Sequence, residues 1–593
     1  MTSSGFTPEF RPNFRVMLVD LSRGKGEVVA FPDRAKWVGG SGLAAGLFAA
    51  YGVPDAPWDD PRQPLIFAIG PLTGFFPLMS KTVCAFKSPY HDQYAESHAG
   101  GRSALSLFFA GVDALVIVGR AERPVVVSLG HRRLQVSDAH FLWGADVFTT
   151  GKRLRKLQVG GSGHRSIWRI GPAGENKLAY ACINVDTYRH FGRLGSGAVM
   201  GAKNLKAILV QGDGDFALPP GKEYARLFQK IFTDMTATDM MSKYHSLGTA
   251  VNLKGLDEIK SLPWRNLQAT SDAGIEGITG QKFADDTLLR NAACAGCPVG
   301  CIHIGFVREK FQTENRYLYR QVAYDYEPIF ATGTMLGVTD AFKVLAIMDQ
   351  VEKYGLDVMS AGVALAWATE AFQKGLISEK ETLVPLSFGD AEGYKQAIYH
   401  LSHAANEFYR ILGQGALVAG KHYHGEDFAC VLGQEMAGYA TGEAFFVAES
   451  LGFRHSHLDT GAYAMDQKSK EKDVVKTVDF LVKDERERIM TTSMVACLFA
   501  RGVYKEEVMK EALRSVGDGP IADNWDAASF ALHKARWKCR FDTGYDPLSI
   551  SIPKRFTEVV TWKGGIDTVY MEELRQAYAK ALTGLGTEPK AEA

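Results

Sequence analysis

Three cysteines in a short, glycine-rich stretch are the clearest chemical feature of this sequence. Cys294, Cys297 and Cys301 follow a C-x2-C-x3-C spacing, with two glycines and a proline among them. Such a turn lets three thiolates converge on one point, which a regular helix or strand would prevent. Three converged thiolates suit a zinc ion or an iron–sulfur cluster, and either normally takes a fourth ligand from elsewhere. A set of reduced, buried cysteines in a turn is the alternative.

The composition describes an ordinary globular protein. The chain has 593 residues, of which 46% are hydrophobic and 23% charged, and this length corresponds to roughly two to four domains. Lys+Arg and Asp+Glu each number 67, so the formal net charge is zero. This balance argues against electrostatic binding of nucleic acid or of an anionic membrane.

Nothing in the sequence predicts a targeting or membrane segment. The first ten residues have no basic stretch followed by an apolar core, and no run of about 18 uninterrupted apolar residues occurs. Eight cysteines in a chain of this length are not a disulfide framework. We expect a cytoplasmic protein with no membrane span.

The first third of the chain reads as β-rich. Four segments have the apolar, β-branched composition of strands, namely 14–21, 64–69, 114–118 and 124–129. Glycine-bearing turns lie between the strand candidates and after them. Glycine lets the backbone approach a ligand closely, and clustered backbone N–H groups hold phosphate oxygens. Each turn alone is explained by chain reversal, but together they indicate a large, phosphate-bearing ligand. The turns are 38–43, 70–74, 99–102, 171–176 and 192–201.

Helical patterns dominate from about residue 213 onward. We predict helices over 223–241, 340–354 and 360–374. Asp340 and Ser360 are the expected N-terminal caps of the second and third helix, and glycines follow the ends of both.

Taken in order, these motifs resemble those of the aldehyde:ferredoxin oxidoreductase family of tungsten-pterin enzymes. The resemblance extends from about Phe14 to Thr583 and includes the glycine turns, the cysteine cluster and Gly355-Leu-Asp-Val-Met-Ser360. It implies an α+β fold. Residues 1–212 would form a β-rich base for two pyranopterins, 213–424 a helical domain with the cysteine cluster, and 425–593 a C-terminal helical domain.

The resemblance also implies that Cys294, Cys297 and Cys301 bind a [4Fe-4S] cluster. The fourth ligand would be Cys497, in Thr492-Ser-Met-Val-Ala-Cys-Leu-Phe, although its apolar neighbours also suit a core cysteine. We expect the remaining four cysteines to be packing residues. They are Cys84, Cys182, Cys430 and Cys539.

Further implied cofactors are a tungsten bis-pyranopterin, with molybdenum as the alternative metal, and Mg²⁺ bridging the pterin phosphates. Several positions depart from the family pattern. Lys81 stands where arginine is usual, His98 where asparagine is typical, Glu352 where the pattern has aspartate, and Thr492 where an acid is expected. The implied cofactor-binding residues are Gly39, Gly40, Gly42, Lys81, His98, Gly100, Gly101, Arg193, Gly195, Gly197, Lys203, Glu352, Gly355, Leu356, Asp357 and Thr492.

For catalysis, Tyr324-Asp-Tyr-Glu-Pro328 resembles a family segment that brings a carboxylate near the metal, so Glu327 is the candidate general base. His455 or His457 would donate a hydrogen bond to the substrate oxygen. A surface glutamate and structural histidines are the alternatives. No cysteine lies between Cys301 and Cys430, which argues against the benzoyl-CoA reductase branch, where a cysteine after the cluster ligates the metal.

The implied reaction interconverts an aldehyde and a carboxylic acid. Electrons would pass through the cluster to ferredoxin or a small iron–sulfur subunit, with homo- and hetero-oligomers both open. A second hypothesis keeps the cofactors and reduces another low-potential substrate, such as an activated acid. A third is a non-catalytic structural subunit with zinc on the four cysteines.

Overall fold

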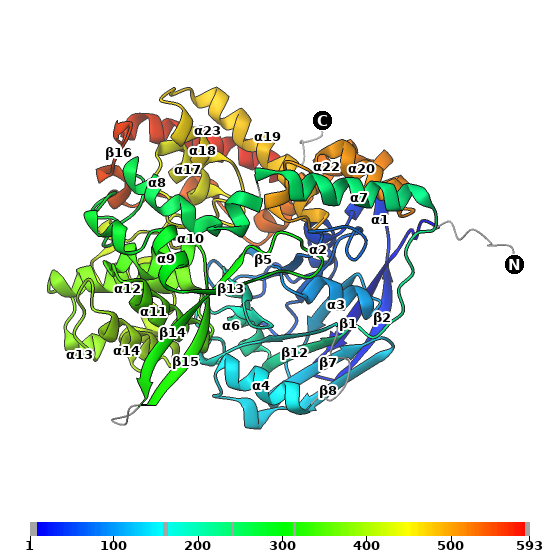
Figure 1. Ribbon diagram of the computed structural model, residues 1–593, viewed down its shortest axis with the longest axis horizontal. Helices are drawn as coiled ribbons and strands as arrows, with labels where there is room; N and C mark the ends of the chain where they lie inside the picture. The colour runs from blue at the N-terminus through cyan, green and yellow to red at the C-terminus, as the bar shows by residue number, and fades with distance from the viewer. Residues whose placement is uncertain (1–8, 158–163, 240, 312–315, 587–593) are drawn as a thin grey trace, which may run out of the picture.

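Two six-stranded sheets form the N-terminal part of the computed structural model, which describes residues 9–157, 164–239, 241–311 and 316–586. They lie at the lower right in Figure 1, coloured blue to cyan. In spatial order, the first sheet consists of β2 (Lys25–Phe31), β1 (Phe14–Asp20), β6 (Ala114–Val118), β3 (Leu65–Ala68), β4 (Thr82–Lys87) and β5 (Tyr94–Ala99). The second consists of β11 (Arg189–Phe191), β10 (Ile183–Val185), β9 (Arg165–Arg169), β12 (Leu205–Gln211), β7 (Val125–Gly130) and β8 (Arg133–Asp138).

The four strands predicted from the sequence are confirmed as β1, β3, β6 and β7. β3 and β4 are buried along their whole length, because both faces of this sheet are covered. Helix α2 (Gly40–Tyr51) packs against both strands on one side. Strands buried on two faces need nearly continuous apolar sequence, which explains why 64–69 was recognisable.

The middle of the chain is mainly helical, but it also contains an antiparallel three-stranded sheet that the sequence pattern did not predict. This sheet comprises β13 (Leu288–Ala292), β14 (Ile302–Phe311) and β15 (Arg316–Tyr324). Charged residues such as Arg308 and Lys310 interrupt the alternation that would have marked β14 as a strand. The three clustered cysteines lie in the connection from β13 to β14.

Three predicted helices are present as α7 (Lys222–Ala237), α11 (Ala341–Tyr354) and α12 (Val358–Gln373). Asp340 caps α11, since its side chain accepts from the Lys343 N–H at 2.9 Å, and Gly355 (φ 77°) ends it. The predicted cap at Ser360 was wrong. Asp357 caps α12 three residues earlier, and the Ser360 hydroxyl donates to Asp357 Oδ2 at 2.7 Å.

The C-terminal part is a helical layer, yellow to red at the top of Figure 1. Its main helices pack on one another and, through α19 and α22, on α2 of the first sheet. They are α17 (Glu443–Leu451), α19 (Val474–Ser493), α22 (Trp525–Asp542) and α23 (Thr568–Gly586). A single hydrophobic cluster extends from Phe14 of β1 to Leu582 of α23, so the three parts share one core.

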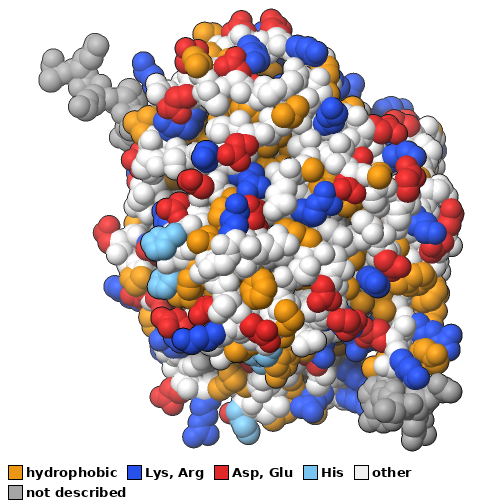
Figure 2. All heavy atoms as spheres, turned by 90° about the vertical axis from the view of Figure 1, so that its left-hand side faces the viewer, with side chains coloured by type: hydrophobic (Ala, Val, Ile, Leu, Met, Phe, Trp, Pro, Cys, Tyr) orange, Lys and Arg blue, Asp and Glu red, His pale blue; other side chains and the backbone are white. Residues whose placement is uncertain are grey.

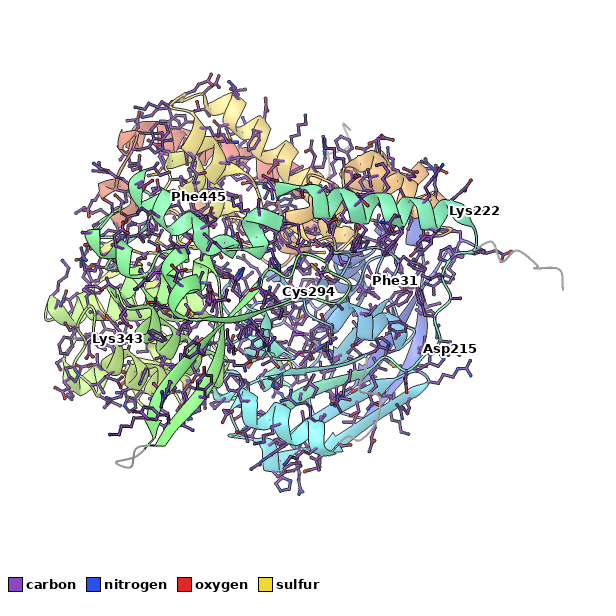
Figure 3. All side chains as sticks on the ribbon, in the orientation of Figure 1. Phe31, Asp215, Lys222, Cys294, Lys343 and Phe445 are labelled. Atoms are coloured by element: carbon purple, nitrogen blue, oxygen red, sulfur yellow. The ribbon has the colours of Figure 1, made fainter. Side chains whose placement is uncertain are left out.

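The surface and the centre of the molecule differ in character. On the face drawn in Figure 2, acidic and basic side chains are interspersed, as the balanced charge predicts. Figure 3 places Cys294 near the middle of the molecule, with Lys343 and Lys222 toward its edges.

Within the described residues, no single helix has both the length and the apolar composition needed to cross a membrane. The segments Tyr326–Leu336 and Ala341–Tyr354 reach that criterion only when joined, and they are bent by 109° relative to each other.

The N-terminal sheet domain and the C-terminal helices touch at a glycine. Gly40 has φ +41°, and a methyl group built on it would lie 2.3 Å from the Thr492 carbonyl oxygen. Two residues later, the Gly42 N–H donates to Ser493 Oγ at 3.1 Å. Glycine at position 40 is therefore needed for both backbone conformation and contact.

We predict that Gly40→Ala destabilises the fold by about 2 kcal/mol or more, because the left-handed conformation and the overlap with Thr492 add together. Urea denaturation of the purified variant measures this. Gly519→Ala is the matched control, since no atom lies within 4 Å of a methyl group at that position. Equal unfolding midpoints for the two variants would contradict the prediction.

Candidate active site

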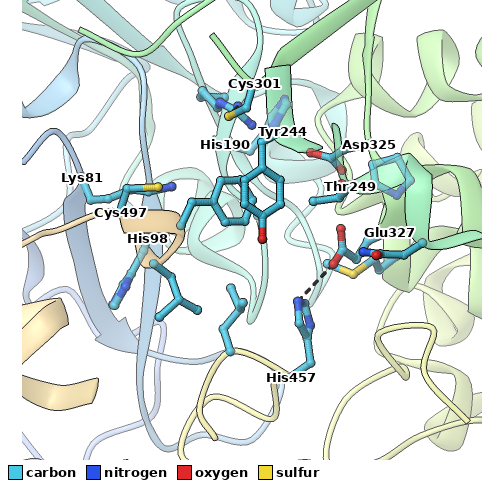
Figure 4. Close-up of a pocket in the computed structure, with 18 of the residues that line it drawn as sticks. Lys81, His98, His190, Tyr244, Thr249, Cys301, Asp325, Glu327, His457 and Cys497 are labelled. Carbon is cyan, nitrogen blue, oxygen red and sulfur yellow. Dashed lines mark hydrogen bonds and ion pairs between the residues drawn. The ribbon is translucent and has the colours of Figure 1, made fainter. Parts of the chain in front are cut away.

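A cavity of about 1100 Å³ lies where the three parts of the chain meet. Figure 4 shows Lys81 and Cys497 on one side of it and Glu327 and His457 on the other. Many of the residues predicted from the sequence line this cavity. They are Lys81, His98, Cys294, Cys297, Cys301, Glu327, Glu352, Leu356, Asp357, His457, Thr492 and Cys497.

The β13–β14 connection presents three thiols to the cavity. It is held against the turn after β5, because the Ala295 N–H donates to the Gly101 carbonyl at 2.9 Å. At Gly100 the approach is so close that a methyl group would lie 2.7 Å from Cys294 Sγ. Gly100 and Gly101, both predicted from the sequence as cofactor-binding residues, therefore position the cysteine loop.

Cys497 reaches the same cavity from the segment after α19. The backbone of Leu78 joins it to the cysteine loop: the Leu78 N–H donates to the Gly296 carbonyl at 3.3 Å, and its carbonyl accepts from the Cys497 N–H at 2.9 Å. The Lys81 N–H also donates to the Val495 carbonyl at 3.2 Å. The β3–β4 connection thus sets the fourth cysteine relative to the other three.

Arg189, at the start of β11, supplies positive charge beside the thiols. Its guanidinium donates to Cys301 Sγ at 3.9 Å. Burial by itself raises the pKa of the Cys294 thiol, but the charges of Arg189 and Lys81 bring that pKa below its ordinary value. Nothing in the sequence had marked Arg189, because its partners are distant along the chain.

The four thiols face one cavity without surrounding one ion. Among residues 9–157, 164–239, 241–311 and 316–586, no three His, Cys, Asp or Glu side chains form a group that could hold a single metal ion. A zinc ion would require the sulfurs at about 2.3 Å from one centre.

Glu327 lies in the first turn of α10 (Tyr326–Thr332) and faces the cavity. Its Oε1 accepts from the Tyr439 hydroxyl at 3.0 Å and lies 3.0 Å from His457 Nε2. Burial raises the pKa of this carboxyl, but the hydrogen bonds and the charge of His457 more than offset burial, so the pKa lies below its ordinary value. Glu327 is therefore ionised at neutral pH.

The two candidate histidines have different environments. His457 lines the cavity, and its Nδ1 is buried without a hydrogen-bond partner among the described residues. His455 does not line it. Its Nδ1 lies 3.1 Å from the Glu449 carbonyl, and Arg540 donates to its Nε2. Burial and then Arg540 hold the pKa of His455 well below its usual range, as suits a neutral structural histidine.

Asp325 is a cavity residue that sequence reasoning passed over, although it lies two positions before Glu327. It occupies the N-cap of α10 without capping it, and Thr249 Oγ1 instead accepts from the Tyr326 N–H at 2.9 Å. Burial, followed by repulsion from Glu327, raises the pKa of Asp325 to about 6.

His98 lines the cavity with both ring nitrogens engaged. Arg454 Nη1 lies 3.1 Å from its Nδ1, and Glu96 Oε2 lies 3.2 Å from its Nε2. Burial and the Arg454 charge lower the pKa of His98 to about 4. The ring is therefore neutral at neutral pH, accepting from Arg454 and donating to Glu96.

The predicted acidic residues on the α11–α12 side are each paired. Glu352 Oε1 lies 2.9 Å from His190 Nε2, and Asp357 Oδ2 lies 3.3 Å from Arg193 Nε. Arg193 therefore acts through Asp357 and is not itself a lining residue. Opposite them, the Thr492 hydroxyl donates to the Ile489 carbonyl at 3.1 Å.

Other predicted residues lie behind the cavity wall. Lys203 is turned away from it, because its ammonium donates to the Pro61 and Gly119 carbonyls at 3.1 and 3.2 Å. The remaining glycines allow close backbone packing, as at Gly197, where a methyl group would lie 2.5 Å from the Cys182 carbonyl oxygen. Those that do not line the cavity are Gly39, Gly40, Gly42, Gly100, Gly101, Gly195, Gly197 and Gly355.

Two family models match the chain almost end to end. The aldehyde ferredoxin oxidoreductase N-terminal domain matches residues 16–212, and domains 2 and 3 of the same family match residues 226–582. The chain belongs to the aldehyde ferredoxin oxidoreductase family.

Several curated proteins of this family are similar in sequence. The tungsten-containing aldehyde ferredoxin oxidoreductase of Pyrococcus horikoshii is 31% identical over 437 residues, which are 72% of this chain and 70% of that protein. The Pyrococcus furiosus protein of the same name is 33% identical over 387 residues, 64% and 62% of the two chains. An aliphatic sulfonate oxidoreductase, WOR-like subunit, of P. furiosus is 28% identical over 426 residues, 68% and 66%.

Among solved structures, the active site complex BamBC of benzoyl coenzyme A reductase, in complex with 1,5 dienoyl-CoA, has the same fold. Its TM-score is 0.79 over 96% of this chain and 95% of that chain, at 19% sequence identity. The family fold thus extends over the whole described cavity.

The pKa of Asp325 predicts a pH-dependent stability difference. Its folded pKa lies above its ordinary value, so Asp325 destabilises the fold increasingly as pH rises from about 4 through about 6. We expect Asp325→Asn to melt at a higher temperature than the wild type at pH 8, and the gap to shrink toward pH 4.

Glu327→Gln is the control, because its stability should change in the opposite direction. The lowered pKa of Glu327 makes its ionised form stabilising above its ordinary pKa, so this variant should lose stability at pH 8. Calorimetric melting temperatures of both variants and the wild type, measured at pH 4 and pH 8, test these two predictions. A wild-type-like profile for Asp325→Asn would contradict the assignment.

Proposed function

We propose that this protein is a tungstopterin oxidoreductase that interconverts an aldehyde and a carboxylic acid and passes electrons through a [4Fe-4S] cluster. The observation that carries the proposal is the shared cavity, in which four cysteines face the Glu327–His457 pair. The names of the P. horikoshii and P. furiosus relatives support tungsten and the aldehyde.

The residues present fit the cofactors that the family implies. Four cysteine thiols meet at one cavity but form no single-ion group in the described chain, which favours a cluster over zinc. Arg189, which lines the cavity, also has a buried donor, Nε, without a partner among the described residues. An unsatisfied buried donor is costly, and a phosphate-bearing or sulfur-rich group would satisfy it.

In this proposal Cys294, Cys297, Cys301 and Cys497 hold the cluster. Lys81, Glu352, Asp357 and Thr492, which line the cavity, would hold the pterins, with tungsten the metal favoured by the relatives' names and molybdenum the alternative. Both nitrogens of His98 are engaged, so Mg²⁺ would take phosphate and water ligands without this ring.

The chemistry divides between cofactor and chain. When bound, a tungstopterin would accept the two electrons of the oxidation and a cluster would relay them one at a time. The chain positions the substrate and handles the proton. Glu327 uses Oε1 for two hydrogen bonds, and an ionised carboxylate has further acceptor sites, so Glu327 can take a proton from water that attacks the aldehyde carbon.

His457 would orient the substrate. Its Nε2–H donates to the ionised Glu327, which leaves Nδ1 directed elsewhere and unpartnered among the described residues. A protonated ring donates from Nδ1 to the substrate oxygen and stabilises the negative charge that develops there. Asp325, with its raised pKa, is a second group in the cavity that can hold a proton near neutral pH.

Electrons would leave to ferredoxin or a small iron–sulfur subunit. The four proposed cluster cysteines have intermediate exposure, which supports an electron path from the proposed cluster to a partner. All eight cysteines are free thiols, as suits a reducing cytoplasm.

The test is elemental analysis of anaerobically purified protein, followed by aldehyde oxidation with an artificial electron acceptor. We expect about one tungsten and about four irons per chain and acid formation from aldehydes. Zinc alone would overturn the proposal. Tungsten and iron without aldehyde oxidation would redirect it to another low-potential substrate, such as an activated acid.

In the active enzyme, Glu327→Gln should lower kcat by about 10²–10⁴-fold, the usual contribution of a general base, with metal content unchanged. Unchanged kcat would remove Glu327 from the mechanism.

A separate prediction concerns the cysteine loop. Gly100→Ala places a methyl group 2.7 Å from Cys294 Sγ, so this thiol must move and the cluster should be lost or destabilised. We expect iron per chain to fall by at least about half, with tungsten less affected. Gly101→Ala is the comparison, since a methyl group there has no atom closer than 3.5 Å and only its φ of +84° is strained. Full iron content in Gly100→Ala would contradict the prediction.

A further inference from the structure

In the described chain, the exposed residues that line the cavity, here called its mouth, carry positive charge and include no carboxylate. Among the described lining residues, seven are exposed: Ser242, Lys243, Val251, Gly255, Leu458, Lys468 and Arg501. Every charged residue in this set is a cation. The lining carboxylates, at positions 325, 327, 352 and 357, are all buried or half-buried deeper in the cavity.

These three cations are not neutralised. Lys243, Lys468 and Arg501 form no ion pair with a carboxylate in the described part of the chain. Arg501 donates to the Leu498 carbonyl at 3.1 Å and interacts with the Tyr244 side chain, and Lys243 lies 5.5 Å from the centre of the Tyr244 ring. By contrast, Arg488, another lining cation, is paired with Asp484 at 2.8 Å. The charge at the mouth is therefore available to a ligand.

An aromatic wall leads from the mouth toward the reacting end. Tyr244 stacks on Phe499 with ring centres 4.0 Å apart, and Lys243 and Arg501 flank this pair along the chain. Deeper in, the Tyr439 ring lies 5.2 Å from Tyr463 and 4.9 Å from His457. Figure 4 shows Tyr244 projecting between Cys497 and Glu327.

We propose that the enzyme prefers substrates with an aromatic or apolar body and an anionic group at the end remote from the reacting carbon, which Lys243, Lys468 and Arg501 attract. This rests on the proposed function, because Glu327 and His457 define the reacting end. Cations around a concave entrance raise the local concentration of an anionic ligand. The anion is a carboxylate or a phosphate, since either suits exposed Lys and Arg.

The first test compares two aldehydes of equal size with the metal-loaded enzyme and an artificial acceptor. 4-Carboxybenzaldehyde is anionic and 4-formylbenzamide is its neutral counterpart. We expect kcat/KM to favour the anion by about tenfold at low salt and the preference to shrink when ionic strength rises from about 0.02 M to about 0.5 M. 4-Formylphenyl phosphate then distinguishes the two anions. A kcat/KM higher than that of 4-carboxybenzaldehyde identifies phosphate as the preferred anion.

The second test removes the charges. In the triple variant Lys243→Gln, Lys468→Gln, Arg501→Gln, the kcat/KM values of the two aldehydes should differ by no more than about twofold. The kcat for the neutral aldehyde should stay unchanged. Surface substitutions of unpaired residues leave the fold intact. Lys534→Gln is the matched control, an exposed lysine on α22 outside the cavity lining; it should keep the full preference.

Equal kcat/KM values for the two aldehydes in the wild type would overturn the proposal, and so would an unchanged preference in the triple variant. A third contradicting outcome is that the triple substitution raises only the KM for an acidic iron–sulfur protein used as electron acceptor. The last would assign the cations to docking of an electron-transfer partner.

A binding measurement separates this proposal from the proposed function. Calorimetric titration of the loaded enzyme with terephthalate, and with terephthalamide as the neutral control, needs no turnover. Charge-dependent binding that the triple variant loses supports the anion site even if no aldehyde is oxidised.

Discussion

The candidate site depends on one short connection, from β3 to β4, whose backbone holds the two ends of the thiol set together. Leu78 uses both its N–H and its carbonyl for this, toward Gly296 and Cys497. It does so in a left-handed conformation, with φ +59°, which costs a non-glycine residue roughly 1–3 kcal/mol. The shared hydrophobic core stabilises the arrangement against that strain. The sheets therefore act as a frame that sets the distance between two distant segments of the chain.

Charge pairing governs the rest of the cavity. Three of its carboxylates each have a cationic or neutral nitrogen partner: Glu327 with His457, Glu352 with His190 and Asp357 with Arg193. An unpaired carboxylate in such a place is expensive to ionise. Asp325 has no ion-pair partner in the described part of the chain and lies two residues from Glu327, so its pKa is raised to about 6. One site thus contains two carboxylates, two residues apart, whose pKa values are shifted in opposite directions.

Local sequence signals predicted local features well. The buried strands, the Asp340 cap and the glycine after α11 each follow from residues within one turn or strand, and all three are confirmed. The family models confirm the membership that the motifs indicated.

Features that depend on distant partners could not be predicted. The side chain of Lys203 turns toward Pro61 and Gly119, which no local pattern marks. The choice between His455 and His457 rests on Arg540, 85 residues from His455. The Ser360 cap failed for a different reason, since Asp357 is an equally good capping residue and comes first.

The distance along the chain between the third and fourth cysteines has a consequence in time. Cys301 and Cys497 are separated by 497 − 301 = 196 residues. At about 5–20 residues per second, a ribosome needs roughly 10–40 s to supply the last thiol after the first three have emerged. During that interval the proposed ligand set is incomplete, and three neighbouring thiols are open to oxidation. Loading of the proposed cluster would therefore follow the synthesis of Cys497, and the cell would have to keep the nascent chain reduced until then.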